Sequence, residues 1–309
     1  MTIVTLPKGK RHVATTESPL DIVIKTRARD LVPFLQLQTD LATHSRLHGR
    51  LYVIVPRHEL EQFADVLAKG HTLLTAEEVA EAAGYTAEFP DTWFTQQIIK
   101  IIVANIIDNE YCLILNSNTL IGFDFDEQYF LPHGQYVYAV NGFMDVAWEL
   151  QSRNFLGLHE PWRLAGFRSA NQIFSKKNAQ ALIRYVESLY NDNIVRVLLR
   201  YSDHLSTHFW TEFTLYGVFV QSLRESPGHW FEERLDLVYF SLRQNFTQFL
   251  QDIEAQAPLM IKFYKRRAGK YDLAIGDYAR RVSEIKRAYQ RRLERDSPGL
   301  RYIQTFCTC

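Results

Sequence analysis

The sequence predicts an α/β protein with a mixed, mainly parallel sheet flanked by helices and a helical extension at the C-terminus. Two short apolar runs, at 20–25 and 51–55, are separated by a segment whose apolar residues recur at helical spacing. A third apolar run, at 111–115, again follows a segment of helical character. Such alternation of strand and helix favours a parallel sheet with crossover helices.

The elements can be placed in order from apolar periodicity and from the residues that end helices and strands. Pro56 ends the second strand, and Gly84 is a typical helix stop. The chain from 237 onward is expected to be helical throughout. The expected elements are strands at 20–25, 51–55 and 111–115, strand-like pieces at 135–140 and 168–175, and helices at 31–41, 57–69, 76–84, 96–107, 177–190, 210–223 and 277–296.

The strand at 111–115 ends in a polar turn, Asn116-Ser117-Asn118. Ligands of open parallel sheets bind beyond the carboxyl ends of the strands, where loops and helix N-termini converge. Asn and Ser also favour turns for local reasons, because their side chains bond to nearby backbone. The turn is therefore a candidate site by position and an ordinary turn by composition.

Composition excludes several classes of protein. Among 309 residues, Lys plus Arg and Asp plus Glu both number 35, so no overall field attracts nucleic acid. The N-terminus lacks the apolar core of a signal peptide, and no apolar run is long enough to span a bilayer. Three cysteines do not form a disulfide framework, and we expect a cytoplasmic protein. The chain has no Gly-rich phosphate loop and no H-E-x-x-H motif.

Four segments, taken in order, resemble the GT-A type of nucleotide-diphospho-sugar glycosyltransferase, and more closely a poorly characterised bacterial family of that superfamily. They are "DIVIKTRARDL", "QQIIKIIVANIIDNEYCLILNSNTL", "ANQIFSKKNAQALIRYVES" and "WTEFTLYG". The resemblance implies a GT-A-like nucleotide-sugar-binding domain, which we place at 1–245, with a helical extension at 246–309. It also implies transfer of a sugar from a nucleotide-sugar donor to a glycan or lipid-linked acceptor.

The chain departs from this family at the metal motif. Where members carry Asp-x-Asp, this sequence has Asn116-Ser117-Asn118. Two carboxylates beside a divalent cation contribute about 4 kcal/mol each at an effective dielectric near 20, so affinity for Mn²⁺ or Mg²⁺ should be greatly weakened. An amide, unlike a carboxylate, can donate hydrogen bonds to a phosphate oxygen directly. A metal-independent transferase therefore remains compatible with the turn.

The resemblance also implies roles for individual residues. Glu212 is the candidate general base, although a glutamate at a helix N-terminus also suits the helix dipole. Without a bound metal ion, positively charged side chains must neutralise the charge on the departing diphosphate. Lys25 is a further candidate for this role. The expected nucleotide-sugar-binding residues are Thr26, Arg27, Arg29, Gln97, Lys100, Asn116, Ser117, Asn118 and Arg168.

Other metal ligands are weaker candidates. Asp124 and Asp126, at i and i+2, project to the same side of an extended segment and could share one ion if their loop turned back to the strand end. A solvated acidic loop explains them equally well. His204, His208 and His229 lie close to Glu212 in the sequence, and His208 is a possible metal ligand. A lone histidine, however, is more often a surface or core residue. We therefore assign no metal cofactor. If Mn²⁺ or Mg²⁺ binds, Asn116 and Asn118 would be weak ligands for it.

The helix expected at 277–296 is basic and amphipathic. Its apolar stripe could pack on the main domain or on a second subunit, or the helix could lie on an anionic membrane surface.

Lys100 is unusual on an apolar helix, since an unpaired buried ammonium is costly, and it must reach water or an anion. The function predicted is that of a glycosyltransferase-like protein; the alternative is a catalytically inactive protein that keeps the fold as a binding or scaffold module.

Overall fold

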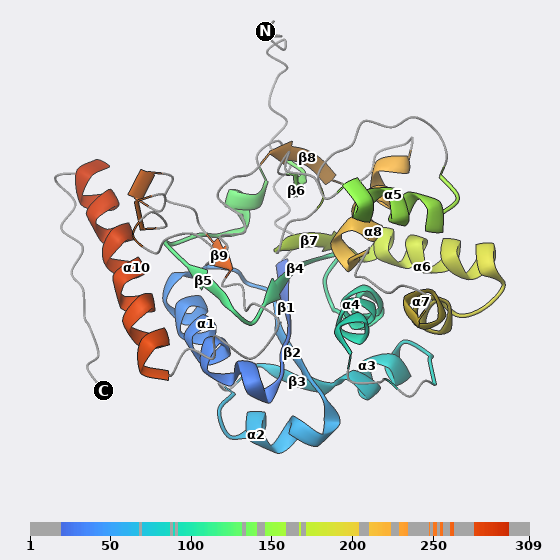
Figure 1. The fold of residues 1–309 in the computed structure, drawn as a ribbon, viewed down its shortest axis with the longest axis horizontal. Helices are drawn as coiled ribbons and strands as arrows, with labels where there is room; N and C mark the ends of the chain where they lie inside the picture. The colour runs from blue at the N-terminus through green and yellow to red at the C-terminus, as the bar shows by residue number, and fades with distance from the viewer. Residues whose placement is uncertain are drawn as a thin grey trace, which may run out of the picture.

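The computed structural model describes a central sheet with helices on both faces (Figure 1). The residues described are 20–67, 70–86, 89, 92–131, 134–140, 146–158, 167, 171–203, 210–223, 229–233, 247, 250–251, 254–255, 260–262 and 275–296.

The central sheet has five strands in the order β3-β2-β1-β4-β7. These are β1 (Leu20–Lys25), β2 (Leu51–Val55), β3 (Thr72–Thr75), β4 (Tyr111–Asn116) and β7 (Gln172–Ser175). The first four run parallel, and β7 pairs with β4 in the antiparallel sense. The predicted mixed, mainly parallel sheet flanked by helices is confirmed.

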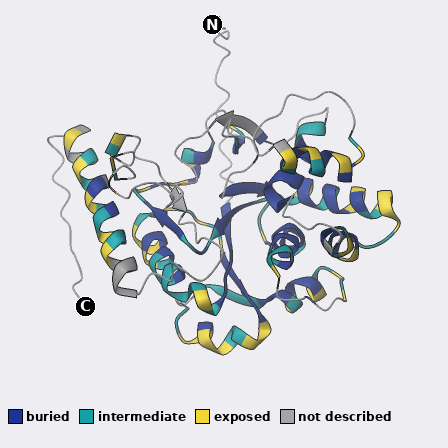
Figure 2. Cartoon of the chain, viewed as in Figure 1, coloured by how far each residue is buried: buried dark blue, intermediate teal, exposed yellow. Residues whose placement is uncertain are grey.

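Two buried clusters lie on opposite faces of this sheet, because successive side chains of a strand point to opposite sides. Val23 and Ile114 belong to the larger cluster, whereas their neighbours Ile24 and Leu113 belong to the other. Figure 2 shows the central strands of the five-stranded sheet as almost continuously buried and the helices around them as buried on their inner sides. A sheet covered on both faces explains why its strands are apolar runs without alternation.

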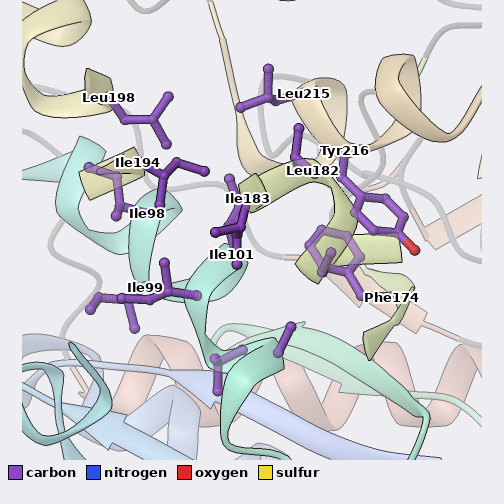
Figure 3. Packing of buried hydrophobic residues seen from close by; sticks show 14 of the residues in the cluster. Ile98, Ile99, Ile101, Phe174, Leu182, Ile183, Ile194, Leu198, Leu215 and Tyr216 are labelled. Atoms are coloured by element: carbon purple, nitrogen blue, oxygen red, sulfur yellow. The ribbon is translucent and has the colours of Figure 1, made fainter. Parts of the chain in front are cut away.

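Helices from distant parts of the chain build the larger cluster. Figure 3 shows isoleucines of α4 packed against side chains of β7 and three later helices. The helices of this layer are α3 (Ala76–Ala82), α4 (Trp93–Ile102), α5 (Val146–Phe155), α6 (Lys176–Tyr190), α7 (Ile194–Asp203) and α8 (Glu212–Ser222). The opposite face is covered by α1 (Leu31–His44) and α2 (Leu60–Ala64), through Phe34, Leu37 and Phe63.

Two small sheets and a long C-terminal helix complete the described structure. β5 (Thr119–Ile121) pairs antiparallel with β9 (Met260–Lys262), and β6 (Tyr136–Val140) pairs parallel with β8 (His229–Glu233). Helix α10 (Ile275–Asp296) lies beside α1 (Figure 1), and Lys286 Nζ donates to the buried carboxylate of Asp40 over 2.6 Å. Short 3₁₀ turns are η1 (Ala28–Asp30), η2 (Arg57–Glu59), η3 (Val103–Asn105) and η4 (Glu127–Phe130).

The buried residues of α10 show where its apolar stripe packs, which was left open between the main domain, a second subunit and a membrane surface. Val282, Ile285 and Ala288 are buried, so the apolar stripe of this helix packs against the rest of the chain. The side chains of Tyr278, Tyr289 and Leu293, also expected on the stripe, lie outside the described residues. In the part of the chain that the structure covers, no helix is both long and apolar enough to cross a membrane.

Several expected boundaries were wrong. The helix expected at 57–69 is a 3₁₀ turn followed by the short α2, and the helix expected at 96–107 runs from Trp93 to Ile102 before a 3₁₀ turn. The C-terminal part is not all helical, because β9 is a strand that completes a ladder with β5. β3 and the helices α5 and α7 were not predicted at all.

Gly49 sits where two backbones approach closely, and this generates a prediction about stability. A Cβ at Gly49 would lie 2.1 Å from the carbonyl oxygen of Leu20, which is the first residue of β1. Because backbone on a central strand cannot give way cheaply, Gly49→Ala should lower the free energy of unfolding by about 3 kcal/mol or more in urea denaturation.

Gly134→Ala is the matched control. Gly134 has φ of +72°, but no atom lies within 4 Å of the position that an added Cβ would occupy. The same substitution should therefore cost only about 1–2 kcal/mol through backbone strain. Equal losses for the two variants would contradict the contact at Leu20.

Candidate functional site

The candidate site lies at the carboxyl ends of β1 and β4. Lys25 ends β1 and pairs in register with Asn116, which ends β4. Since Val23 and Ile114 face the cluster that contains α4, alternation directs Lys25 and Asn116 to the same side of the sheet. Thr26 and Arg27 follow β1 directly and are both buried. The lysine that ends β1, the asparagine that ends β4 and the two buried polar residues after β1 thus meet at one sheet edge.

Lys100, Glu212 and Asn116 form the centre of the site. Lys100 Nζ donates to Glu212 Oε1 over 2.7 Å and to Asn116 Oδ1 over 3.0 Å. Lys100 is 4% exposed and Glu212 is 1% exposed. The ammonium also lies 5.2 Å from the centroid of the Phe213 ring. The anion expected for Lys100 is therefore the carboxylate of Glu212, 112 residues later in the chain.

Local structure explains how these two charges are positioned. Lys100 lies in the last turn of α4, and Glu212 is the first residue of α8, so each charge also complements the dipole of its own helix. Thr211 caps α8, because its side chain accepts a hydrogen bond from the backbone N–H of Thr214 over 3.1 Å. The cap fixes the start of α8 and with it the position of Glu212.

Glu212 uses only one of its two oxygens in this arrangement. Oε1 accepts from Lys100, whereas Oε2 is buried and has no hydrogen-bond partner among the described residues. A carboxylate oxygen in this state is able to accept a proton or a hydrogen bond from a bound group. Both roles considered for Glu212, helix N-terminal charge and proton acceptor, are thus compatible with its geometry.

Lys25 is the least compensated charge of the site. It is 6% exposed, and its Nζ donates one hydrogen bond, to the carbonyl oxygen of Thr26 over 3.1 Å. No carboxylate of the described chain lies within ion-pair distance of it. Burial above all, with repulsion from Arg27 and Lys100, lowers the pKa of Lys25 to about 8, against the opposing effect of Glu59 and Glu77. An ammonium in such surroundings is stabilised when an anion binds beside it.

The residues after β1 add further polar groups. Thr26 Oγ1 is buried without a hydrogen-bond partner in the described part of the chain. Burial, followed by repulsion from Arg29, lowers the pKa of Arg27 from its ordinary value. The backbone N–H of Ala28 donates to Glu59 Oε2 over 2.7 Å, which ties the loop after β1 to the loop after β2.

The Asn-Ser-Asn turn is held from below by Asn171, which sequence reasoning did not single out. Asn171 is fully buried, and its Oδ1 accepts from the backbone N–H of Asn116 over 3.4 Å and from Thr119 Oγ1 over 3.2 Å. Ser117 is buried, while Asn116 and Asn118 are half-buried. The two amides therefore stand at the rim of the sheet and not in its core.

Other predicted site residues have different positions. Gln97 is buried and donates to the carbonyl oxygen of Trp93 over 3.1 Å, within its own helix. Arg29 is largely exposed and lies 3.8 Å from Asp30. His229 is buried, with Nε2 2.7 Å from the hydroxyl of Tyr216, and burial lowers its pKa to about 4. Arg168, His204 and His208 lie outside the described residues.

Asp124 and Asp126 do not join Asn116. Asp124 Oδ1 lies 2.8 Å from His44 Nδ1, at the end of α1, and Asp126 accepts from the backbone N–H of Tyr129 over 3.3 Å. Helix α1 carries the chain from the carboxyl end of β1 towards the amino end of β2, a path of about 21 Å. The two aspartates are therefore at the opposite edge of the sheet, and the idea that they replace the metal motif is wrong.

The donor set at the strand ends does not fit a divalent cation. The groups nearest the turn are neutral amides and the cations Lys25 and Lys100, and Glu212 is occupied by an ammonium. Within the described ranges no three His, Cys, Asp or Glu residues gather as metal ligands. The charge of this edge suits a bound anion, which needs no metal bridge to reach Lys25.

The Lys100–Glu212 pair should behave as a coupled unit. Removing one partner leaves a buried unpaired charge, so Lys100→Met and Glu212→Leu should each lower the free energy of unfolding by about 3–5 kcal/mol. The double variant should lose less than the sum, and urea denaturation of all four proteins measures the coupling.

Glu149→Leu provides the control for this cycle. Glu149 is also buried and pairs with Arg153 over 2.9 Å, whereas the ion-pair partner of Lys100 among the described residues is Glu212. In the double variant with Lys100→Met, the decreases in the free energy of unfolding should be additive. If the decreases caused by Lys100→Met and Glu212→Leu are also additive, the two charges are not coupled.

Comparisons with known proteins place the chain in a family but give it no activity. No curated protein matches it. Similar solved structures include mouse xyloside xylosyltransferase 1 (12% identity, 79% of this chain and 97% of that chain, TM-score 0.44) and the galactosyltransferase LgtC (12%, 86% and 95%, 0.46). Another is the glycosyltransferase GlyE of Streptococcus pneumoniae (10%, 91% and 64%, 0.45). At these sequence identities and TM-scores, the similarity to solved structures supports no conclusion about function. Residues 21–247 match a family of unknown function, DUF6492, and the chain belongs to that family.

Proposed function

We propose that the protein transfers a sugar from a nucleotide-sugar donor to a glycan or lipid-linked acceptor, without a divalent cation at the Asn116–Asn118 turn. The observation that carries this proposal is the buried ammonium of Lys25, which has a single backbone acceptor and lies beside Arg27 and Lys100. A buried ammonium without an ion-pair partner at the carboxyl edge of a parallel sheet is suited to a phosphate group. The ordered resemblance of four sequence segments to GT-A glycosyltransferases supports the same assignment.

The proposed donor site uses the residues that follow β1 and β4. The diphosphate lies against Lys25 and Arg27, whose charges offset the negative charge that develops on the leaving group. The amide groups of Asn116 and Asn118 contact phosphate oxygens directly, in place of a metal bridge. Lys100 holds Asn116 by its Oδ1, so this amide is oriented before the donor binds.

Glu212 is the proposed base. The acceptor hydroxyl gives its proton to Oε2 while its oxygen bonds to the anomeric carbon of the donor sugar, and the nucleoside diphosphate leaves with the electron pair of the broken C–O bond. Lys100 fixes the orientation of the carboxylate through Oε1. Asn116 and Glu212 share one ammonium, so the groups that bond to it lie within about 6 Å of each other. Donor and acceptor chemistry can thus meet at one point.

Calorimetric titration with UDP and with GDP, with and without Mn²⁺, tests the donor site. We expect one of the two nucleotides to bind at millimolar concentration or tighter, with little effect of Mn²⁺, and Lys25→Met to weaken binding at least about tenfold. Absence of binding by both nucleotides would overturn the proposal.

Two variants control this experiment. Lys177→Met removes an exposed lysine and should leave binding unchanged. Asn116→Asp combined with Asn118→Asp restores the acidic motif: donor hydrolysis that appears only in this variant, and only with Mn²⁺, would identify the native chain as an inactive descendant. Hydrolysis by the native chain that resists EDTA supports the metal-independent enzyme.

Binding should also depend on pH through Lys25. The pKa of Lys25 in the free protein is about 8, and a bound diphosphate favours the ammonium form and raises this pKa. Affinity is therefore complete well below pH 8 and falls as the pH rises through about 8. Lys25→Arg, whose guanidinium stays charged, should bind with a flat profile over pH 7–9 in the same titration. The same decline in the arginine variant would assign it to another group.

A further inference from the structure

The C-terminal helix α10 carries a row of exposed arginines that has no role in the donor site. Arg280, Arg287, Arg291 and Arg295 are exposed. They occupy positions i, i+7, i+11 and i+15, so they share one side of the helix. Figure 2 shows exposed residues recurring along α10. The row extends over about 22 Å of helix. We call these four residues the arginine row.

The arginine row stands on a helix that the core holds in place. Val282 and Ile285 are buried against the rest of the chain, and Lys286 Nζ donates to the buried carboxylate of Asp40 on α1. The apolar stripe of α10 is thus used for packing within the chain and is not available for insertion into a bilayer. The side of α10 that can meet a partner is the charged one.

Carboxylates neutralise part of the arginine row and leave the rest charged. Arg280 and Arg291 each pair with a glutamate. Arg287 and Arg295 donate to backbone carbonyl oxygens, over 3.4 and 2.8 Å, and have no ion-pair partner among the described residues. Their positions differ by eight residues, or about 12 Å along the helix. Two guanidinium groups on one side of α10 therefore face water without a counter-charge.

The sequence separates its charge between the C-terminal region and the remainder. Residues 260–309 contain 13 Lys or Arg and 5 Asp or Glu, whereas residues 1–259 contain 22 and 30. The net charges are therefore +8 and −8, although the whole chain is neutral. An anionic surface attracts the first region and repels the second, which orients the protein with α10 towards that surface.

The form of the arginine row favours a flat polyanion. A single row on the outer side of one helix can contact a plane along its whole length. Guanidinium groups bond well to phosphate groups, which are the charged groups of phospholipids. Proteins that bind single-stranded nucleic acid stack its bases on aromatic rings beside their cations. The exposed aromatic residues of the described chain, Tyr185 and Tyr190, lie on α6 and not on α10.

We infer that the arginine row docks the protein on an anionic phospholipid bilayer, with α10 lying along the headgroups and not inserted between the acyl chains. Arg287 and Arg295 supply the unmatched charges, and Arg280 and Arg291 add to the attraction. The inference goes beyond the proposed function, because none of the residues assigned to the donor site lies on α10.

Co-sedimentation of the full chain with vesicles tests this inference. The chain should bind vesicles of phosphatidylcholine with about one third phosphatidylglycerol, and not vesicles of phosphatidylcholine alone. Binding should fall steeply between about 0.1 M and 0.5 M NaCl. The triple variant Arg287→Gln, Arg291→Gln, Arg295→Gln should bind about a hundredfold more weakly, at about fivefold for each arginine removed.

A matched variant removes the same charge from another surface. Arg184, Arg196 and Arg200 are exposed on α6 and α7, whose layer covers the face of the central sheet opposite to that covered by α1 (Figure 1). Replacing all three by Gln should leave vesicle binding within about twofold. Urea denaturation checks that both triple variants keep the fold. If the variant of α10 unfolds, the lipid and salt dependence of the native chain still decides.

Several results would overturn docking on a bilayer. They are equal binding to the two kinds of vesicle, equal weakening by the two triple variants, and tighter binding of a DNA or RNA duplex through the same arginines. Dimers in sedimentation velocity that disappear in the variant of α10 would show that the row meets the acidic region of a second copy, and the inference would be wrong. UDP or GDP binding by the same variants should stay unchanged, and its absence concerns the donor proposal alone.

Discussion

The ion pair between Lys100 and Glu212 determines how the elements at the sheet edge are arranged. Both charges are withdrawn from water, so each is tolerated only while the other stays within hydrogen-bond distance. That requirement fixes the last turn of α4 against the first turn of α8, and the second hydrogen bond of the ammonium, to Asn116, adds the end of β4. Such polar contacts inside an apolar layer are directional, whereas the isoleucines around them could pack in more than one way.

The same edge contains a buried lysine that forms no ion pair with the described carboxylates. Glu212 is committed to Lys100, and Glu59 is bonded to the backbone of Ala28, so the hydrogen bond that Lys25 makes goes to a carbonyl oxygen, with Glu59 and Glu77 acting on it only at longer range. A protein that only needed to fold would gain by an apolar residue at this position. The retained charge, together with unsatisfied atoms on Thr26, Trp210 and Glu212, supports the proposal that a ligand binds at this edge.

Local pattern predicted β1, β2, β4 and most helices of the core, because apolar runs such as "LDIVIK" reflect burial on both sides of a sheet. β3 was missed since Thr72–Thr75 is short and half-buried at the sheet edge. Lys100 and Glu212 were each singled out, but no local pattern pairs residues 112 positions apart. Asp124 and Asp126 misled for the converse reason: their spacing suits a metal, and only the path of α1 separates them from Asn116.

The contact between Asp40 and Lys286 has a consequence for how the chain reaches its folded state. Asp40 is fully buried on α1, and the lysine that neutralises it comes 246 residues later. During synthesis the carboxylate of Asp40 therefore has, among the described residues, only the amide of Gln36 and the backbone N–H of Ile121 as donors until α10 has emerged. The final packing of α1 therefore awaits the synthesis of α10.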